Sequence, residues 1–114
     1  MTSQHLIRFA DLPISRWANG KGDTVELARH PASDPFEWRL SSATITEASA
    51  SSPLPGVARV LMALTPGPLA LTIDGAETTL ARHESVTFTG DREVAALGPR
   101  TPQRDLNLMA RSGI

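Results

Sequence analysis

Proline and glycine interrupt this chain at short intervals, and their spacing limits its secondary structure more than any other feature. The 114 residues include nine prolines and eight glycines. Proline cannot donate a backbone hydrogen bond, and glycine favours turns, so few uninterrupted stretches are long enough for a helix. The spacing therefore predicts many short strands separated by turns.

Polar and apolar residues alternate in most of the stretches between these breakers. In "TVELARH" (24–30) and "FEWRLSSATIT" (36–46), successive side chains would point to opposite faces of a strand. The apolar run "VARVLMAL" (57–64) fits a buried strand, although its spacing also fits a helix. Between them, "EASASSPLPG" (47–56) is typical of a loop. The further predicted strands are 69–74, 75–80, 85–91, 93–98 and 105–110.

The dipeptide Asp74–Gly75 predicts a tight hairpin between two of these strands. A type I′ turn needs positive φ at both central residues, and this dipeptide tolerates it. Hairpin signals are local and strands outnumber helices. We therefore predict an all-β antiparallel barrel or sandwich that forms one domain over residues 1–114.

The composition excludes several classes of function. The chain has no cysteine, which excludes disulfides, thiolate zinc sites and cysteine nucleophiles. A net charge of −1, with lysines and arginines scattered singly, disfavours a nucleic-acid partner. The N-terminus lacks the apolar core of a signal peptide, and no stretch resembles a membrane span. We expect a cytoplasmic protein without a membrane partner.

The stretch "SRWANGKGDTVEL" (15–27) superficially resembles a phosphate-binding loop. A Walker loop needs lysine after the last glycine and a hydroxyl residue after the lysine. Here Lys21 lies between Gly20 and Gly22, and Asp23 places a negative charge where phosphate would bind. Asn19–Gly20 is instead a strong turn signal. The stretch predicts a tight turn that leads into a strand.

Three predicted strands carry polar residues on one face and apolar residues on the other. Such faces suit either the solvated outside of a sheet, which is the commoner arrangement, or the lining of a barrel mouth that holds a ligand. The polar faces are formed by Thr24 with Glu26, by Arg39 with Ser41, and by Asn107 with Met109 and Arg111.

Five stretches together resemble the HutD/Ves family of cupin-like proteins. They are "RWANGKGDTVEL", "FEWRLSSATI", "LPGVARVLMALTPG", "TFTGD" and "DLNLMAR", in the order and approximate spacing of that family, from Trp17 to Arg111. The resemblance implies an RmlC-like jelly-roll β-barrel, usually two units in one chain, in a bacterial cytoplasmic protein. It also implies a link to histidine utilisation in one branch and to stress response in the other.

The chain departs from the family pattern in three places. Lys21 stands where a small residue is more common, and the segment before Arg59 lacks an aromatic and an acidic residue. The chain also ends at "ARSGI", where relatives usually continue into a second barrel unit. A single unit would expose strand edges that invite pairing, so we expect a homodimer.

The resemblance shifts the interpretation of the polar faces from a solvated surface to a ligand pocket. Arg39 is the strongest candidate because its guanidinium can bind a carboxylate with two hydrogen bonds, although a structural pair with Glu26 or Asp91 is the plain alternative. Three converging arginines would favour an anionic ligand. The predicted ligand-binding residues are Asn19, Thr24, Glu26, Arg39, Ser41, Arg59, Asn107 and Arg111.

The sequence predicts neither a metal nor another cofactor. Cupin metal sites need closely spaced histidines, whereas His5, His30 and His83 are isolated. Ser41 has no histidine at a spacing that suggests a catalytic triad. We predict no catalytic residue.

These observations lead to three hypotheses of function. The preferred one is a non-catalytic cupin-like protein that binds a small anionic metabolite and has a regulatory role in histidine utilisation or stress response. The second is a metal-independent isomerase or lyase with Glu26 or Asp91 as its base. The third is a structural module whose polar faces lie in a subunit interface.

Overall fold

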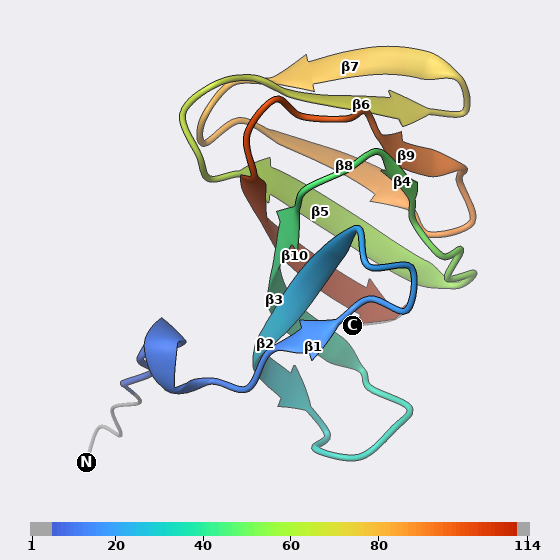
Figure 1. Cartoon of the computed structure of the whole chain (residues 1–114). Coiled ribbons are helices and arrows are strands. Elements are labelled where there is room, and N and C mark those ends of the chain that lie inside the picture. The colour runs from blue at the N-terminus through green and yellow to red at the C-terminus, as the bar shows by residue number, and fades with distance from the viewer. Residues whose placement is uncertain (1–5, 112–114) are drawn as a thin grey trace.

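The computed structural model describes residues 6–111, and the regular secondary structure of these residues is almost entirely β-strand (Figure 1). The helical element among them is one 3₁₀ turn, η1 (Phe9–Asp11), and no helix of this part is long or apolar enough to cross a membrane. The strands are β1 (Ser15–Arg16), β2 (Gly22–His30), β3 (Trp38–Ile45), β4 (Ser49–Ala50), β5 (Val57–Ala63), β6 (Leu69–Ile73), β7 (Ala76–Leu80), β8 (Ser85–Thr89), β9 (Val94–Ala96) and β10 (Gln103–Arg111).

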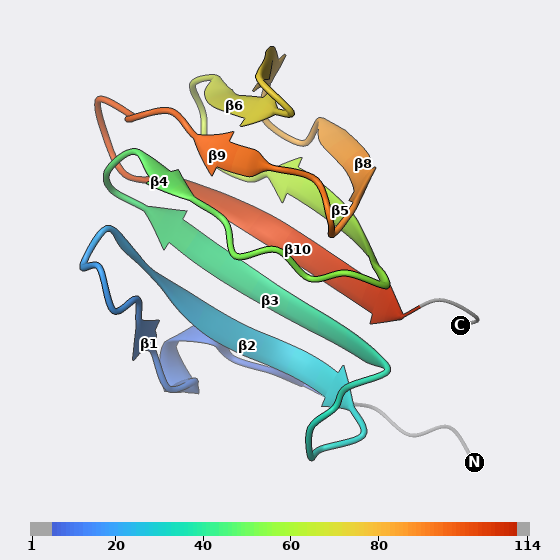
Figure 2. The same cartoon turned by 90° about the vertical axis from the view of Figure 1, so that its right-hand side faces the viewer.

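The strands form two antiparallel sheets. The larger sheet has the order β1-β2-β3-β10-β5-β8, and the smaller has the order β4-β9-β6-β7. Figure 2 shows β2, β3, β10 and β5 side by side in the larger sheet. The C-terminal strand β10 thus lies between β3 and β5, far from both in sequence. This is the predicted antiparallel all-β fold.

The hydrophobic core lies between the two sheets. Its buried side chains come from β3, β5, β6, β7, β8 and β9, with Leu69 and Leu71 the most deeply buried leucines. A smaller cluster of Phe36, Val57 and Met109 lies apart from it. The core therefore occupies only part of the space between the sheets, and polar side chains line much of the remainder.

The predicted hairpin and strands are confirmed, with adjustments at their ends. Asp74 and Gly75 have φ of 50° and 82°, as a type I′ turn requires, and join β6 to β7. The predicted loop 47–56 contains the short strand β4, because Ser49 and Ala50 pair with β9. The run 57–64 is a strand and not a helix, but it is buried on one face only.

The turn predicted at Asn19–Gly20 is present, and the second glycine of this stretch, Gly22, lies where the chain packs too closely for a side chain. Gly20 has a φ of 72°, and the Lys21 amide donates to Asn19 Oδ1 at 2.9 Å. Gly22 opens β2 beneath the indole ring of Trp17. A Cβ at Gly22 would lie 2.5 Å from Thr44 O and 2.8 Å from Trp17 Cζ3. The glycine permits close packing rather than phosphate binding.

Gly22→Ala should therefore destabilise the fold by about 1–3 kcal/mol, because the indole or the β3 backbone must move. Gly98→Ala is the matched control, since a Cβ there would lie 3.6 Å from Ala48 N, an ordinary contact. Chemical denaturation of both variants measures the difference. Equal stability of the two variants would contradict this account of the glycine.

Candidate functional site

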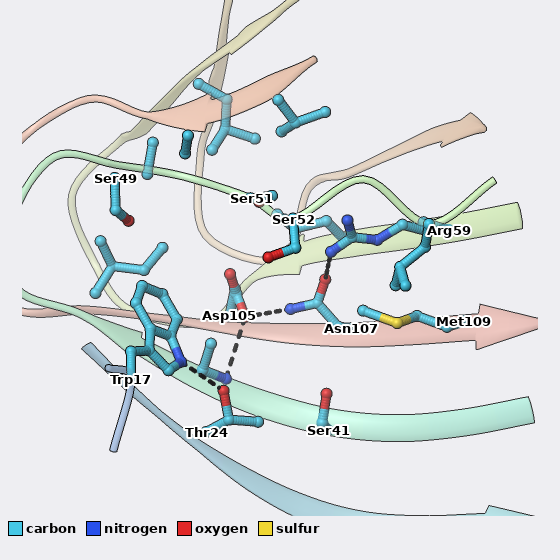
Figure 3. Close-up of a pocket in the computed structure, with 18 of the residues that line it drawn as sticks. Trp17, Thr24, Ser41, Ser49, Ser51, Ser52, Arg59, Asp105, Asn107 and Met109 are labelled. Atoms are coloured by element: carbon cyan, nitrogen blue, oxygen red, sulfur yellow. Dashed lines mark hydrogen bonds between the residues drawn. The ribbon is translucent and has the colours of Figure 1, made fainter. Parts of the chain in front are cut away.

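A cavity of about 580 Å³ lies between the two sheets, within the range of sites that bind small molecules (Figure 3). The larger sheet supplies most of its polar lining, and the smaller sheet supplies mainly apolar side chains from β6 and β9. Its principal polar lining residues are Asn19, Thr24, Arg39, Ser41, Ser49, Ser51, Ser52, Arg59, Asp105 and Asn107.

The register of the larger sheet explains how residues distant in sequence meet in this cavity. Residues paired across antiparallel strands lie side by side on the same face. Three such rows cross the cavity floor. They are Thr24–Ala43–Asp105, Ser41–Asn107–Leu61 and Arg39–Met109–Arg59.

Asp105 is the most deeply buried ionisable group of the lining, with 2% of its surface exposed. Its Oδ1 accepts hydrogen bonds from the Ala43 amide at 3.2 Å and from Asn107 Nδ2 at 2.6 Å. Burial raises the pKa of this carboxyl to about 7, and the Ala43 amide, the charge of Arg59 and Asn107 only partly offset that effect. Near neutral pH, Asp105 therefore exists in both its neutral and its charged form.

Arg59 is a buried cation, 7% exposed, that lines the same cavity. Its Nη2 donates to Asn107 Oδ1 at 3.5 Å, and its guanidinium lies 5.2 Å from the centroid of the Phe88 ring. Among residues 6–111, no group accepts a hydrogen bond from its Nε, and no carboxylate lies within ion-pair distance of the guanidinium. Burial lowers the pKa of Arg59, opposed by the charge of Asp105, yet an arginine in a protein keeps its proton.

Glu26 pairs with arginines and does not belong to the cavity lining. Its Oε1 accepts a hydrogen bond from Arg39 Nε at 2.9 Å and lies 3.1 Å from Arg29 Nε. A bulge after Glu26 shifts the register of β2, so that Arg29 lies directly opposite Arg39. Glu26 thus separates two like charges. Arg39 lines the cavity, but the structural pair with Glu26 that the sequence left as an alternative is present.

Arg111 also lies outside the lining, so the expected convergence of three arginines is wrong. Its Nε donates to Phe36 O at 2.6 Å, and its guanidinium lies 5.1 Å from the Phe36 ring centroid. Arg111 is two residues beyond Met109, past the end of the rows that form the floor. Six of the eight predicted residues line the cavity, namely Asn19, Thr24, Arg39, Ser41, Arg59 and Asn107.

Sequence reasoning missed Asp105 although the signal was present. Asp105 precedes Asn107 by two residues, so the alternation that grouped Asn107 with Met109 places Asp105 on the same face. It also missed the serines of the loop around β4, which line the cavity from the other side. Thr24 was found, and its Oγ1 accepts a hydrogen bond from Trp17 Nε1 at 2.8 Å.

Metal-ligating side chains do not gather in the part of the chain that the structure describes. No group of three or more His, Asp or Glu residues there could hold an ion. His30 lies 3.8 Å from Glu37 at the exposed end of β2, and His83 lies in an exposed turn. The prediction for His5 falls outside the described residues.

Asp105→Asn should remove a pH dependence of stability. The folded carboxyl keeps its proton up to about pH 7, whereas the unfolded one releases it near 3.8, so the wild-type free energy of unfolding falls as pH rises between these values. The pKa difference corresponds to on the order of 4 kcal/mol. Relative to wild type, the variant should gain stability from pH 5 to pH 8 in urea denaturation. Asp91→Asn, in an exposed turn, is the control; the same pH profile for both variants would contradict the prediction.

Comparison with known protein sequences identifies the family of this chain. The HutD family model matches residues 9–114. Protein Ves of Citrobacter koseri is 41% identical over 103 residues, which cover 88% of this chain and 54% of that protein. An uncharacterised 21.2 kDa protein from the hutC 3′ region of Pseudomonas putida is 32% identical over 112 residues, 96% of this chain and 59% of that protein. The chain thus spans little more than half the length of these relatives.

Solved structures agree with the sequence matches. HutD from Pseudomonas fluorescens SBW25, solved in a formate condition, superposes with a TM-score of 0.85 at 32% identity, covering 92% of this chain and 59% of that one. An RmlC-like cupin from Shewanella frigidimarina has a TM-score of 0.71 at 14% identity, covering 97% of this chain and 94% of that one, and so shares the fold. The predicted jelly-roll fold is confirmed, and the chain belongs to the HutD family.

Proposed function

We propose that this chain is a non-catalytic cytoplasmic protein that binds a small carboxylate metabolite in the cavity, with Arg59 as its anchor. The observation that carries the proposal is a buried guanidinium that lines a cavity without any ion-pair partner among the described residues. Removing a cation from water is unfavourable unless a counter-charge or several hydrogen bonds replace the lost solvation. A ligand carboxylate would supply both.

The surroundings of Arg59 are suited to holding that cation for a ligand. Asn107 fixes the guanidinium through one long hydrogen bond, and the ring of Phe88 lies against it. Neither group neutralises the charge. Arg39 adds a second guanidinium to the lining, but Glu26 already pairs with it, so Arg59 is the main attraction for an anion.

A regulatory role in histidine utilisation or stress response is part of this proposal. It is supported by the names of the relatives, one of which lies in a hutC 3′ region. The residues of the cavity support ligand binding only, and the regulatory role rests on the relatives.

The alternative of a metal-independent isomerase or lyase with Glu26 or Asp91 as base has no support from their positions. Glu26 is held by two arginines outside the cavity lining, and Asp91 lies in an exposed turn after β8. The homodimer and the structural module stay predictions. The outer face of β10 gives them some support, because Leu108 is 44% exposed at the middle of the sheet, and light scattering would test them.

Arg59→Gln should weaken carboxylate binding about 10- to 150-fold, the loss expected for one or two charge-assisted hydrogen bonds. Calorimetry and thermal shift with formate, acetate, succinate and glutamate at pH 6 would measure it. A ligand at about 100 times its Kd should stabilise the wild type by about 2.7 kcal/mol. Arg39→Ala should have a smaller effect, because Glu26 already occupies that guanidinium.

Arg82→Gln is the matched control, since this arginine lies in an exposed turn and donates to Leu64 O away from the cavity. It should bind as the wild type does. Absence of saturable binding with every carboxylate, or undiminished affinity in a folded Arg59→Gln variant, would refute the proposal.

A further inference from the structure

The Asp105 carboxyl and the Arg59 guanidinium both lie on the cavity floor, where Asn107 connects them by hydrogen bonds without an ion pair between them. Asn107 lies between Asp105 and Arg59, donating from Nδ2 to Asp105 Oδ1 at 2.6 Å and accepting from Arg59 Nη2 at its own Oδ1, 3.5 Å away (Figure 3). The amide is therefore fixed in one orientation. It keeps the carboxyl and the guanidinium on the same floor without direct contact, with the cavity above both.

The two oxygens of Asp105 have different surroundings. Oδ1 accepts both of the hydrogen bonds that hold the side chain, one from the Ala43 amide and one from Asn107. No described residue donates a hydrogen bond to Oδ2. When Asp105 carries a proton, Oδ2 is therefore the atom to hold it, because Oδ1 already faces two donors. The O–H on Oδ2 would then be a donor with no partner among residues 6–111.

Of the residues that the structure describes, Asp105 is the one acidic residue of the cavity lining, whose other charged residues are Arg39 and Arg59. On the larger sheet, Asp105 is flanked by Ala43 of β3 and Ala63 of β5, and Thr24 of β2 lies next to Ala43. The charged groups farther along this face of the four strands are Glu26, Arg29, Arg39, Arg59 and Arg111. The facing strands contribute the uncharged residues Leu71, Val94, Ala96 and Ser49. His30 and His83 do not line the cavity.

We infer that the cavity binds a monocarboxylate together with one proton, the ligand carboxylate lying between the Arg59 guanidinium and the protonated Oδ2 of Asp105. This inference rests on the proposed function and names the ligand class and the regulation of that site. Two carboxylates in one desolvated cavity repel each other strongly when both are charged. Protonation of Asp105 removes the repulsion and converts a repelling atom into a hydrogen-bond donor.

The charges of the lining also limit the ligand class. With Arg39 matched by Glu26 and Asp105 neutral, one positive charge remains for the ligand, that of Arg59. A monocarboxylate balances it, whereas a dicarboxylate would bring a second, unmatched negative charge into the cavity. The carboxyl of Asp105 is close to half-protonated near neutral pH, because its burial raises its pKa to about 7. Affinity should therefore vary across the physiological range.

The measurement is calorimetric titration of formate or acetate, whichever binds the wild type more tightly at pH 6, in buffers of different ionisation enthalpy. Proton uptake should be near zero at pH 5.5 and should approach one per ligand near pH 8. Affinity should fall by about tenfold for each pH unit above 7. Succinate should bind more weakly than acetate.

Two variants separate this inference from a merely structural role for Asp105. Asp105→Asn keeps an acceptor for the Ala43 and Asn107 donors and places a permanent donor at the Oδ2 position. It should bind at pH 8.5 about as tightly as the wild type does at pH 6, without proton uptake. Glu77→Gln removes an exposed carboxylate on β7 and should retain the wild-type pH dependence.

Binding that is independent of pH in the wild type, or pH dependence that persists in Asp105→Asn, would overturn the inference while leaving carboxylate binding itself intact. Preference for succinate over acetate would overturn the assigned ligand class. A lack of binding at every pH would refute both this inference and the proposed function. The proton uptake of the wild type decides the matter even if Asp105→Asn fails to fold.

Discussion

The position of β10 between β3 and β5 is the constraint on which the cavity depends. This double pairing places Asp105 and Asn107 beside residues from two strands that are distant in sequence. It also brings Arg59 of β5 within reach of Asn107. A register slip of one residue would turn Leu106 and Leu108 inward and carry the polar floor to the outside. The same pairing therefore sets both the fold and the chemistry of the site.

The cavity and the core adjoin each other between the sheets, and several core side chains, among them Leu61 and Leu71, also line the cavity. Leu69 and Leu71 are almost fully buried. On the cavity floor, buried polar groups take positions that apolar core side chains would otherwise occupy. Asp105 is tolerated there because a backbone amide and Asn107 replace part of its lost hydration. Arg59 receives less compensation, and this difference supports the proposal that the cavity binds a ligand.

The pairing of Glu26 with two arginines shows that membership of a polar strand face does not predict whether a residue lines the cavity. By alternation, Glu26 belongs to the same face as Ser41 and Asn107, as the sequence predicted. The β2 bulge then places Arg29 opposite Arg39, and Glu26 is drawn between them. Bulges depend on tertiary packing and leave no clear mark in one sequence. Arg111, at the end of β10, is likewise turned to the Phe36 carbonyl by a loop whose path the sequence does not reveal.

The sequence by itself determined the strand pattern, the Asp74–Gly75 hairpin, the turn before Gly22 and the family, because turn chemistry and alternation are local properties. It also identified six of the ten principal polar residues that line the cavity. Only the tertiary structure decided that this face is enclosed, that Asp105 belongs to it as a titrating group, and that Arg59 has no ion-pair partner in the described part of the chain. The burial of a side chain depends on whether the opposite sheet excludes water from it, and its charge balance depends on the charges and hydrogen bonds that neighbouring strands supply. Both kinds of contact join segments that are far apart in the chain.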